Sequence, residues 1–134
     1  LFTDSHIASR IRDAFLYYTK ITPLDLYLLG CGRHFRLNEN LKIIAARNRE
    51  ESEQLEKYKM HADYFFIPDF PGPSVFVKGV ISKTDKIKIS GIITRYSKLF
   101  DPSKRIIIYA SDKITGEMQT VPPLTDEEID SWRL

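Results

Sequence analysis

Apolar positions three and four residues apart mark the beginning of the chain. The stripe consists of Ile7, Ile11, Ala14, Phe15 and Tyr18. This spacing predicts an amphipathic helix that packs the stripe onto the core. The polar side chains of Arg10, Arg12 and Asp13 would then face away from the core. The candidates for the N-cap of this helix are Thr3, Asp4 and Ser5.

Two shorter helices are indicated by the residues that would cap them. Thr22–Pro23 predicts a helix start, because proline is favoured in the first turn, and this helix would end at Gly30 or Gly32. Asn48 is followed three residues later by a glutamate, which together make a capping box for a helix over about 49–59.

A longer helix is predicted over 82–98, where apolar residues return to helical spacing. These residues are Ile89, Ile92, Ile93 and Tyr96. Gly91 lies among them and costs a helix about 1 kcal/mol relative to alanine, so it indicates either a weaker helix or close packing. A last short helix begins at the capping box of Thr125 and Glu128 and ends with Trp132.

Short apolar runs between these helices predict strands. They cover residues 41–47, 64–67, 74–78 and 105–110. The second and third would form a hairpin around a proline-rich turn over 68–73. The pattern therefore predicts an α+β fold, with a small mixed sheet of about four strands packed with about four helices in a single domain.

Length and composition agree with one globular domain. The chain has 134 residues, of which 43% are hydrophobic and 28% are charged. No apolar run is long enough to cross a bilayer, so we expect no membrane partner. Cys31 has no second cysteine to pair with, which suits a cytoplasmic protein. Because the chain begins at Leu1, we expect it to be the C-terminal part of a larger protein.

Positive charge is unevenly distributed, although the formal net charge is only +2. The segment 33–49 holds five basic residues and one acid. The segment 83–105 holds seven basic residues and two acids. A nearly neutral protein with such segments can present a basic face. Lys83, Lys86 and Lys88 would lie at a helix start, where positive charge opposes the helix dipole. This favours a functional role for them, with a solvated helix face as the alternative.

No catalytic motif is visible in the sequence. The phosphate-binding, dinucleotide-binding and hydrolase signatures are absent, as are paired metal-ligand motifs, so we expect no cofactor and no metal. Cys31 could act as a nucleophile, but a small buried residue at a helix end is the simpler interpretation. Asp63 is a second candidate for chemistry, and turn formation is its alternative.

The segment from Gly32 to Arg36 combines basic and aromatic residues in a predicted loop. It contains Arg33, His34, Phe35 and Arg36. RNA is held by phosphate contacts from basic side chains and by stacking of bases on rings, so this composition suits an RNA site. The alternative is a solvated loop with Phe35 in the core, and the residues themselves favour neither.

The middle of the chain resembles the NFACT-R RNA-binding domain. In that family a strand ends in Gly-Arg-Asn, a helix follows, and then come Asp-x-Trp-x-His and Pro-Gly. The matching residues here are Arg47, Asn48, Asp63, Pro71 and Gly72. The sequence departs from this pattern at Ala46, Phe65, Ile67 and Ser74. The segment 32–37 and the opening of the chain are similar to a subset of the family.

In that subset the domain follows a PP-loop domain in predicted tRNA thiouridylases, which are often labelled tRNA methyltransferase-like proteins. The resemblance thus implies an RNA-binding, and more narrowly tRNA-binding, accessory domain of a tRNA sulfurtransferase-type enzyme. Residues 1–38 would be a helical lead-in and 39–134 the core. The expected RNA-binding residues are Arg33, His34, Phe35, Arg36, Arg47, Asn48, Lys83, Lys86, Lys88 and Arg95. The alternative is a protein-interaction domain that docks on a preceding catalytic domain or forms a homodimer.

Overall fold

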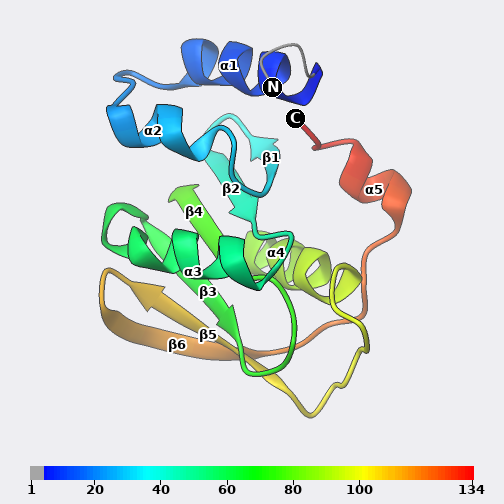
Figure 1. Cartoon of the computed structure of the whole chain (residues 1–134). Helices are drawn as coiled ribbons and strands as arrows, with labels where there is room; N and C mark the ends of the chain where they lie inside the picture. The colour runs from blue at the N-terminus through cyan, green and yellow to red at the C-terminus, as the bar shows by residue number, and fades with distance from the viewer. Residues whose placement is uncertain (1–4) are drawn as a thin grey trace.

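A six-stranded sheet runs through the protein, and its strands lie in the order β1-β2-β4-β3-β5-β6 (Figure 1). The computed structural model describes residues 5–134, without the side chain of Ser5. The predicted caps Thr3, Asp4 and Ser5 therefore lie outside what it describes. The strands are β1 (Arg33–Asn38), β2 (Leu41–Ala45), β3 (Tyr64–Pro68), β4 (Val75–Gly79), β5 (Arg105–Ala110) and β6 (Lys113–Gln119).

The helices lie on both faces of this sheet. They are α1 (Ser5–Tyr17), α2 (Pro23–Leu28), α3 (Arg49–Lys57), α4 (Lys83–Arg95) and α5 (Asp126–Asp130), with a short 3-10 helix over Lys59–His61. The α+β class and the single sheet are as the sequence predicts. The predicted mixed sheet is wrong in its strand direction, because every neighbouring pair is antiparallel.

The four predicted strands are confirmed, and two strands were missed. β1 replaces the predicted loop over 32–36 and pairs with β2 along its whole length. Its basic residues conceal the alternation of apolar and polar positions that usually reveals a strand. Phe35 points into the larger core, and the polar His34 is also buried. β6 is an exposed polar edge strand beside β5, so it shows no apolar pattern that a sequence could reveal.

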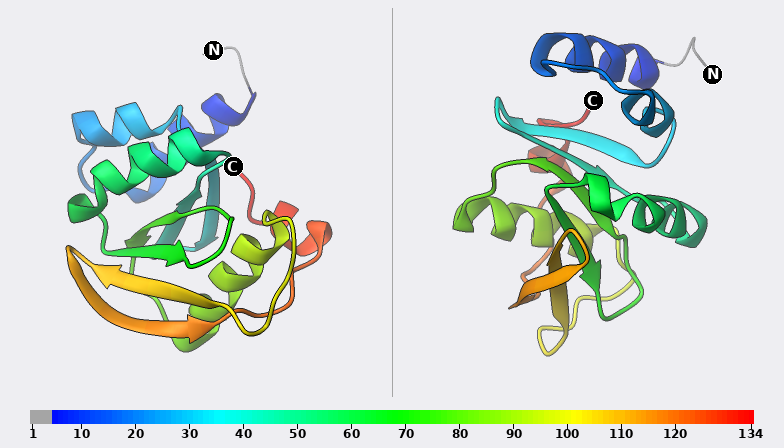
Figure 2. Two further views of the ribbon diagram at one scale, coloured as in Figure 1. Left: turned by 60° about the horizontal axis from the view of Figure 1, so that its bottom comes forward. Right: turned by 90° about the vertical axis from the view of Figure 1, so that its left-hand side faces the viewer.

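Two apolar cores hold the layers together, one on each face of the sheet (Figure 2). The larger core lies under α4 and α5, and it includes the fully buried Ile89, Ile92 and Ile93 of α4. Each such side chain contributes about 1.5–3 kcal/mol through burial. The smaller core lies under α2 and α3 and includes Leu28 and Leu55. The apolar stripe predicted for α4 thus faces inward.

The predicted caps at Thr22 and Thr125 are present, and each accepts a hydrogen bond from the third residue of its helix in a capping box. Ser82 makes a further capping box that was not predicted from the sequence. Asn48 caps α3 by accepting from the N–H of Glu51 at 2.9 Å, but the predicted capping box is incomplete because the Glu51 carboxylate accepts from the N–H of Arg47. Gly91 marks close packing, because a Cβ atom there would lie 2.6 Å from Cγ of Leu124.

The inward face of helix α1 agrees only in part with the prediction. Ala14 is buried and Arg12 is exposed as predicted. Arg10 and Asp13 are buried instead of exposed, at 4% and 5%, whereas Phe15 of the predicted stripe is 74% exposed. The guanidinium of Arg10 donates to the carbonyl oxygens of Leu29 at 2.6 Å and Gly32 at 3.1 Å. Polar groups of α1 face inward because the part of the sheet beneath it carries the basic side chains of Arg36 and Lys42. The carboxylate of Asp13 neutralises part of their charge.

The C-terminal residues close the outer edge of β1. The N–H of Arg36 donates to the carbonyl of Trp132 at 3.0 Å, and the N–H of Leu134 donates to the carbonyl of His34 at 3.0 Å. This pairing covers part of an otherwise open strand edge. Among residues 5–134, no helix combines the length and apolar character needed to cross a bilayer.

Candidate nucleic-acid interface

An open groove of about 700 Å³ lies between the start of α3, the loop joining β3 to β4, and the end of α4. Arg47, Asn48, Pro71 and Gly72 are among the residues that line it. The two pairs are distant in sequence, and both belong to the motif that the sequence shares with the NFACT-R pattern. The fold therefore brings most of the motif into one concave surface.

Arg47 is held at the groove by Glu51, one turn further along the chain. Its guanidinium donates to the Glu51 carboxylate at 2.6 Å, and its backbone N–H donates to the same carboxylate at 2.9 Å. Burial by itself would raise the pKa of Glu51, but these hydrogen bonds outweigh it and lower the pKa to about 2. Glu51 thus stays ionised and fixes Arg47, while Asn48 begins α3 with its positive end at the groove.

Two aromatic rings also line the groove. Phe70 and Tyr96 are both half-buried and line it. The guanidinium of Arg33 lies over the Tyr96 ring, 4.1 Å from its centre. Arg33 therefore adjoins the groove from β1, although it was predicted as part of a loop. A flat cation on a ring offers a surface on which a base can stack.

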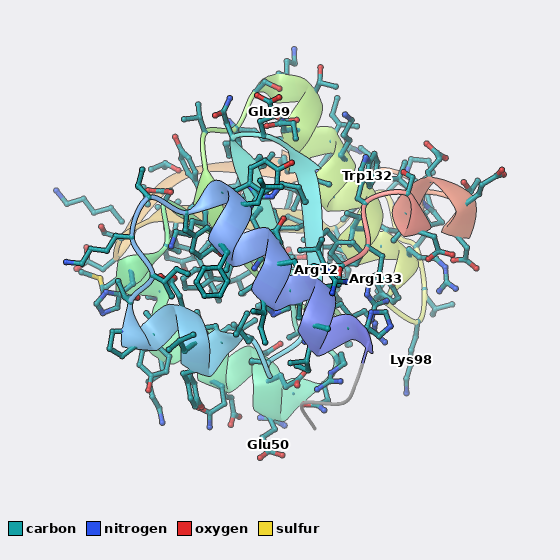
Figure 3. The ribbon with its side chains drawn as sticks, turned by 90° about the horizontal axis from the view of Figure 1, so that it is seen from above. Arg12, Glu39, Glu50, Lys98, Trp132 and Arg133 are labelled. Carbon is teal, nitrogen blue, oxygen red and sulfur yellow. The ribbon has the colours of Figure 1, made fainter. Side chains whose placement is uncertain are left out.

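The charge of the groove is mixed. Its cations are Arg47, Arg49 and Lys98, and its acids are Glu53 and Glu56. Arg49 lies 3.5 Å from Glu53, and both side chains are largely exposed, so water weakens this pair. Figure 3 shows the Lys98 side chain extending away from the ribbon. The basic residues gather near the start of α3 and the end of α4, and the two acids lie further along α3.

His34, Phe35 and Arg36 lie away from the groove surface. Phe35 is fully buried, as the alternative interpretation of this segment had it. His34 is 1% exposed, and its Nε2 lies 2.9 Å from the carbonyl oxygen of Leu28. Burial, with the nearby charges of Lys42 and Arg10, lowers the pKa of His34 well below its usual value.

The predicted lysine cluster lies at the other end of α4 from the groove. Lys83, Lys86 and Lys88 are in its first turns, and a helix of 13 residues is about 20 Å long. Lys88 lies over the Trp132 ring. Arg95, also predicted to contact RNA, forms an ion pair with Asp126 of α5. The structure thus places the basic residues of the second segment at two separate locations.

The candidates for chemistry have structural roles here. Cys31 is buried, which raises the pKa of its thiol to about 11 and disfavours the reactive thiolate. The Asp63 carboxylate accepts from the N–H of Gly79 at 2.7 Å. The described part of the chain contains no cluster of three metal-ligating side chains.

Several groove residues were missed from the sequence. Arg49, Phe70, Tyr96 and Lys98 have no pattern of their own, and only folding brings them together. The proline-rich turn was a partial signal, since a rigid loop between paired strands can present a side chain such as Phe70 at a surface.

Comparison with known proteins gives two findings. The family model described as the NFACT protein RNA binding domain matches residues 32–133, which leaves α1 and α2 outside the match. The fold is similar to that of a Streptococcus suis structure, the C-terminal part of the fibronectin/fibrinogen-binding protein, with a TM-score of 0.56 and 16% identity. That likeness covers 78% of this chain and 49% of the other, and it shows the fold alone. No curated protein matches the chain.

Proposed function

The chain belongs to the family of NFACT protein RNA-binding domains, and from this membership we propose that it binds tRNA in the groove at the start of α3. The observation that carries the proposal is the convergence of the motif residues. Arg47 and Asn48 from one segment and Pro71 and Gly72 from another line a single groove. The family supplies RNA as the ligand class, and the groove supplies a place for it.

The chemistry of the groove fits a nucleic acid. Arg47, Arg49 and Lys98 can contact phosphates, and the positive end of α3 adds to their attraction. Tyr96, carrying the Arg33 guanidinium, and Phe70 offer rings for unpaired bases. The acids Glu53 and Glu56 would repel a phosphate backbone that ran along α3, so the strand would cross the helix at its first turn.

The narrower assignment to tRNA has its support in the sequence resemblance. The subset that this chain resembles carries the domain after a PP-loop domain in predicted tRNA thiouridylases. On this proposal the domain acts in the cytoplasm and presents tRNA to a preceding sulfur-transfer domain of the same protein. On this proposal the domain contributes affinity and orientation, and the reaction occurs on the preceding domain.

The test measures tRNA affinity as a function of salt for two pairs of substitutions. Arg49→Gln with Lys98→Gln removes two exposed cations from the groove. Lys83→Gln with Lys86→Gln removes two from the far end of α4, and Lys113→Gln on the edge strand β6 is the control. The two groove substitutions together should weaken binding and lower the slope of log affinity against log salt by about 1.4–1.8. The two lysine substitutions show whether the cluster at the start of α4 also contributes.

Equal affinity of the groove pair and the Lys113→Gln control would overturn the groove as the site. Equal binding of tRNA and of an unstructured RNA of the same length would remove the tRNA assignment but leave RNA binding intact. Failure of the unmodified chain to bind either RNA at low salt would overturn the proposal as a whole.

A second candidate function is docking to another protein, and one observation favours it. α1 and α2 present apolar side chains to solvent, with Phe15 and Leu16 at 74%, Leu26 at 58% and Tyr27 at 51% exposed. Exposed apolar residues that adjoin one another mark interaction surfaces. Phe70 and Trp132, considered for this role from the sequence, are half-buried against the larger core, and Phe2 lies outside the described residues. Sedimentation of the chain would show whether a homodimer forms.

A further inference from the structure

Three basic side chains form a row across the sheet, away from the groove. Arg36 of β1 lies opposite Lys42 of β2, and Lys42 lies opposite Lys78 of β4. Residues opposite each other on paired strands point to the same face, so the three cations are neighbours. Like charges in these positions repel, and such a row destabilises a sheet unless something compensates it.

The compensation comes from α1 and α2. Asp13 of α1 accepts two hydrogen bonds from Arg36, at 2.9 and 2.8 Å, and lies 3.8 Å from Lys42. Asp25 of α2 lies 2.8 Å from Lys78. Each carboxylate therefore occupies a place beside these cations that the phosphate of a ligand could take.

Aromatic rings at the end of α1 complete the cover. The Arg36 guanidinium lies 4.2 Å from the centre of the Tyr17 ring. The Tyr18 ring has Lys78 at 3.9 Å and Lys42 at 5.3 Å from its centre. Single-stranded RNA contacts a protein through its phosphates and through its stacked bases. Here the carboxylates take the place of the phosphates beside the cations, and the tyrosine rings take the place of the bases.

α1 and α2 neutralise the positive charge of the row only in part. Two carboxylates face three cations, and Lys42 is only 2% exposed although its carboxylate partner is as far as 3.8 Å away. A cavity of about 10 Å³ remains among Tyr18, His34, Lys42 and Lys78. His34, which is buried, also lines this cavity.

Helix α1 is attached by polar contacts more than by apolar ones. Its Ala14 is buried, but Phe15 and Leu16 point to solvent. Elements that bury few apolar side chains open at low free-energy cost. α1 also lies outside the residues that match the family, so the row belongs to the matched domain and the cover does not.

We propose that Arg36, Lys42 and Lys78 form a second phosphate-binding surface for single-stranded RNA, and that α1 with Tyr17 and Tyr18 is a removable cover over it. When α1 leaves, Arg36 and Lys42 lose Asp13 and become available. Lys78 keeps Asp25 and is already 40% exposed. The surface is distinct from the groove, and its existence does not depend on RNA binding there.

The test uses the whole chain with Asp13→Asn, which removes the carboxylate that holds α1 to the row. Asp126→Asn is the control, because Asp126 of α5 also accepts two hydrogen bonds from an arginine, in an exposed pair on the other face of the sheet. Hydrogen exchange should become faster in α1 while β3 and β4 stay protected. Affinity for a single-stranded oligouridylate should rise several-fold over the control, and adding Lys42→Gln should abolish the gain.

The unmodified chain provides a second measurement. Because RNA and α1 compete for the row, saturating oligouridylate should speed hydrogen exchange in α1. Faster exchange in Asp13→Asn without a gain in affinity would overturn the RNA surface. Unchanged exchange in α1, or loss of protection throughout the sheet, would overturn the removable cover. A gain in Asp13→Asn with no effect of the groove substitutions would support the row and refute the groove.

Discussion

Lys42 is the residue where stability and the proposed function conflict most directly. Its side chain is 2% exposed, and burial, only partly offset by Asp13, lowers its pKa from 10.5 to about 8. The perturbation is Lys42→Met, which keeps a long side chain in place and removes the charge. Asp13 is not left unpaired, because its two hydrogen bonds with Arg36 remain.

The magnitude follows from the shift of the pKa. A lowering of about 2.5 pH units corresponds to about 3 kcal/mol against holding the charged lysine in the folded state at pH 7. Replacing buried charge by an apolar side chain of similar volume is often stabilising by about 1–4 kcal/mol. Lys42→Met should therefore raise the free energy of unfolding at pH 7 by about 1–3 kcal/mol.

The assay is urea unfolding of both proteins between pH 7 and pH 10.5. Between pH 8 and 10.5 the unfolded chain binds more protons at Lys42 than the folded chain, so the unmodified protein gains stability as the pH rises. The advantage of Lys42→Met should therefore shrink toward pH 10.5. A variant that is less stable at pH 7, or an advantage that does not change with pH, would refute the reasoning. If Lys42→Met also removes the oligouridylate affinity gained by Asp13→Asn, this loss of function would explain why a destabilising lysine is kept.

Three further predictions concern single sites. Burial lowers the pKa of His34 well below 6.5, so below that pH the imidazole takes up a proton in the unfolded chain but not in the folded one. The free energy of unfolding should therefore decrease as the pH falls below 6.5, by at most about 1.4 kcal/mol per pH unit, and the decrease should be smaller in His34→Gln. Gly79→Ala should destabilise the chain by about 2 kcal/mol or more in urea unfolding, because Gly79 has φ of +131° and a Cβ would collide with the carbonyl oxygen of Asn40. Cys31, with its pKa raised to about 11, should react with iodoacetamide only after unfolding, and rapid reaction of the folded chain would contradict its burial.

The elements that the sequence predicted correctly are those whose signals are local. The caps at Thr22 and Thr125 and apolar runs such as 105–110 depend on residues within one or two turns, so they hold wherever the segment lies. The same applies to the turn between β3 and β4. Membership of the RNA-binding family followed from short motifs of this kind, and the match over 32–133 confirms it.

The features that the sequence concealed depend on partners far along the chain. β1 resembles a basic loop because Arg36 meets Asp13 of α1 and Arg33 meets the Tyr96 ring, and neither contact has a signal in the neighbouring sequence. α1 presents an apolar stripe that predicts its inward face only in part, since the periodicity says that a helix has two faces but not which one finds its partner. The orientation was decided by Asp13, which meets Arg36 and Lys42 only after folding.

The sequence by itself determined the α+β class, most element positions, the family and the residue types that can contact RNA. Tertiary structure alone decided which of those residues can be used. It buried His34 and Phe35, separated Lys83 from Lys98 by the length of α4, and brought Arg47 and Pro71 into one groove. The physical reason is that secondary structure follows from short-range periodicity and capping, whereas a binding surface is a set of side chains whose neighbours and exposure are set by contacts between distant segments.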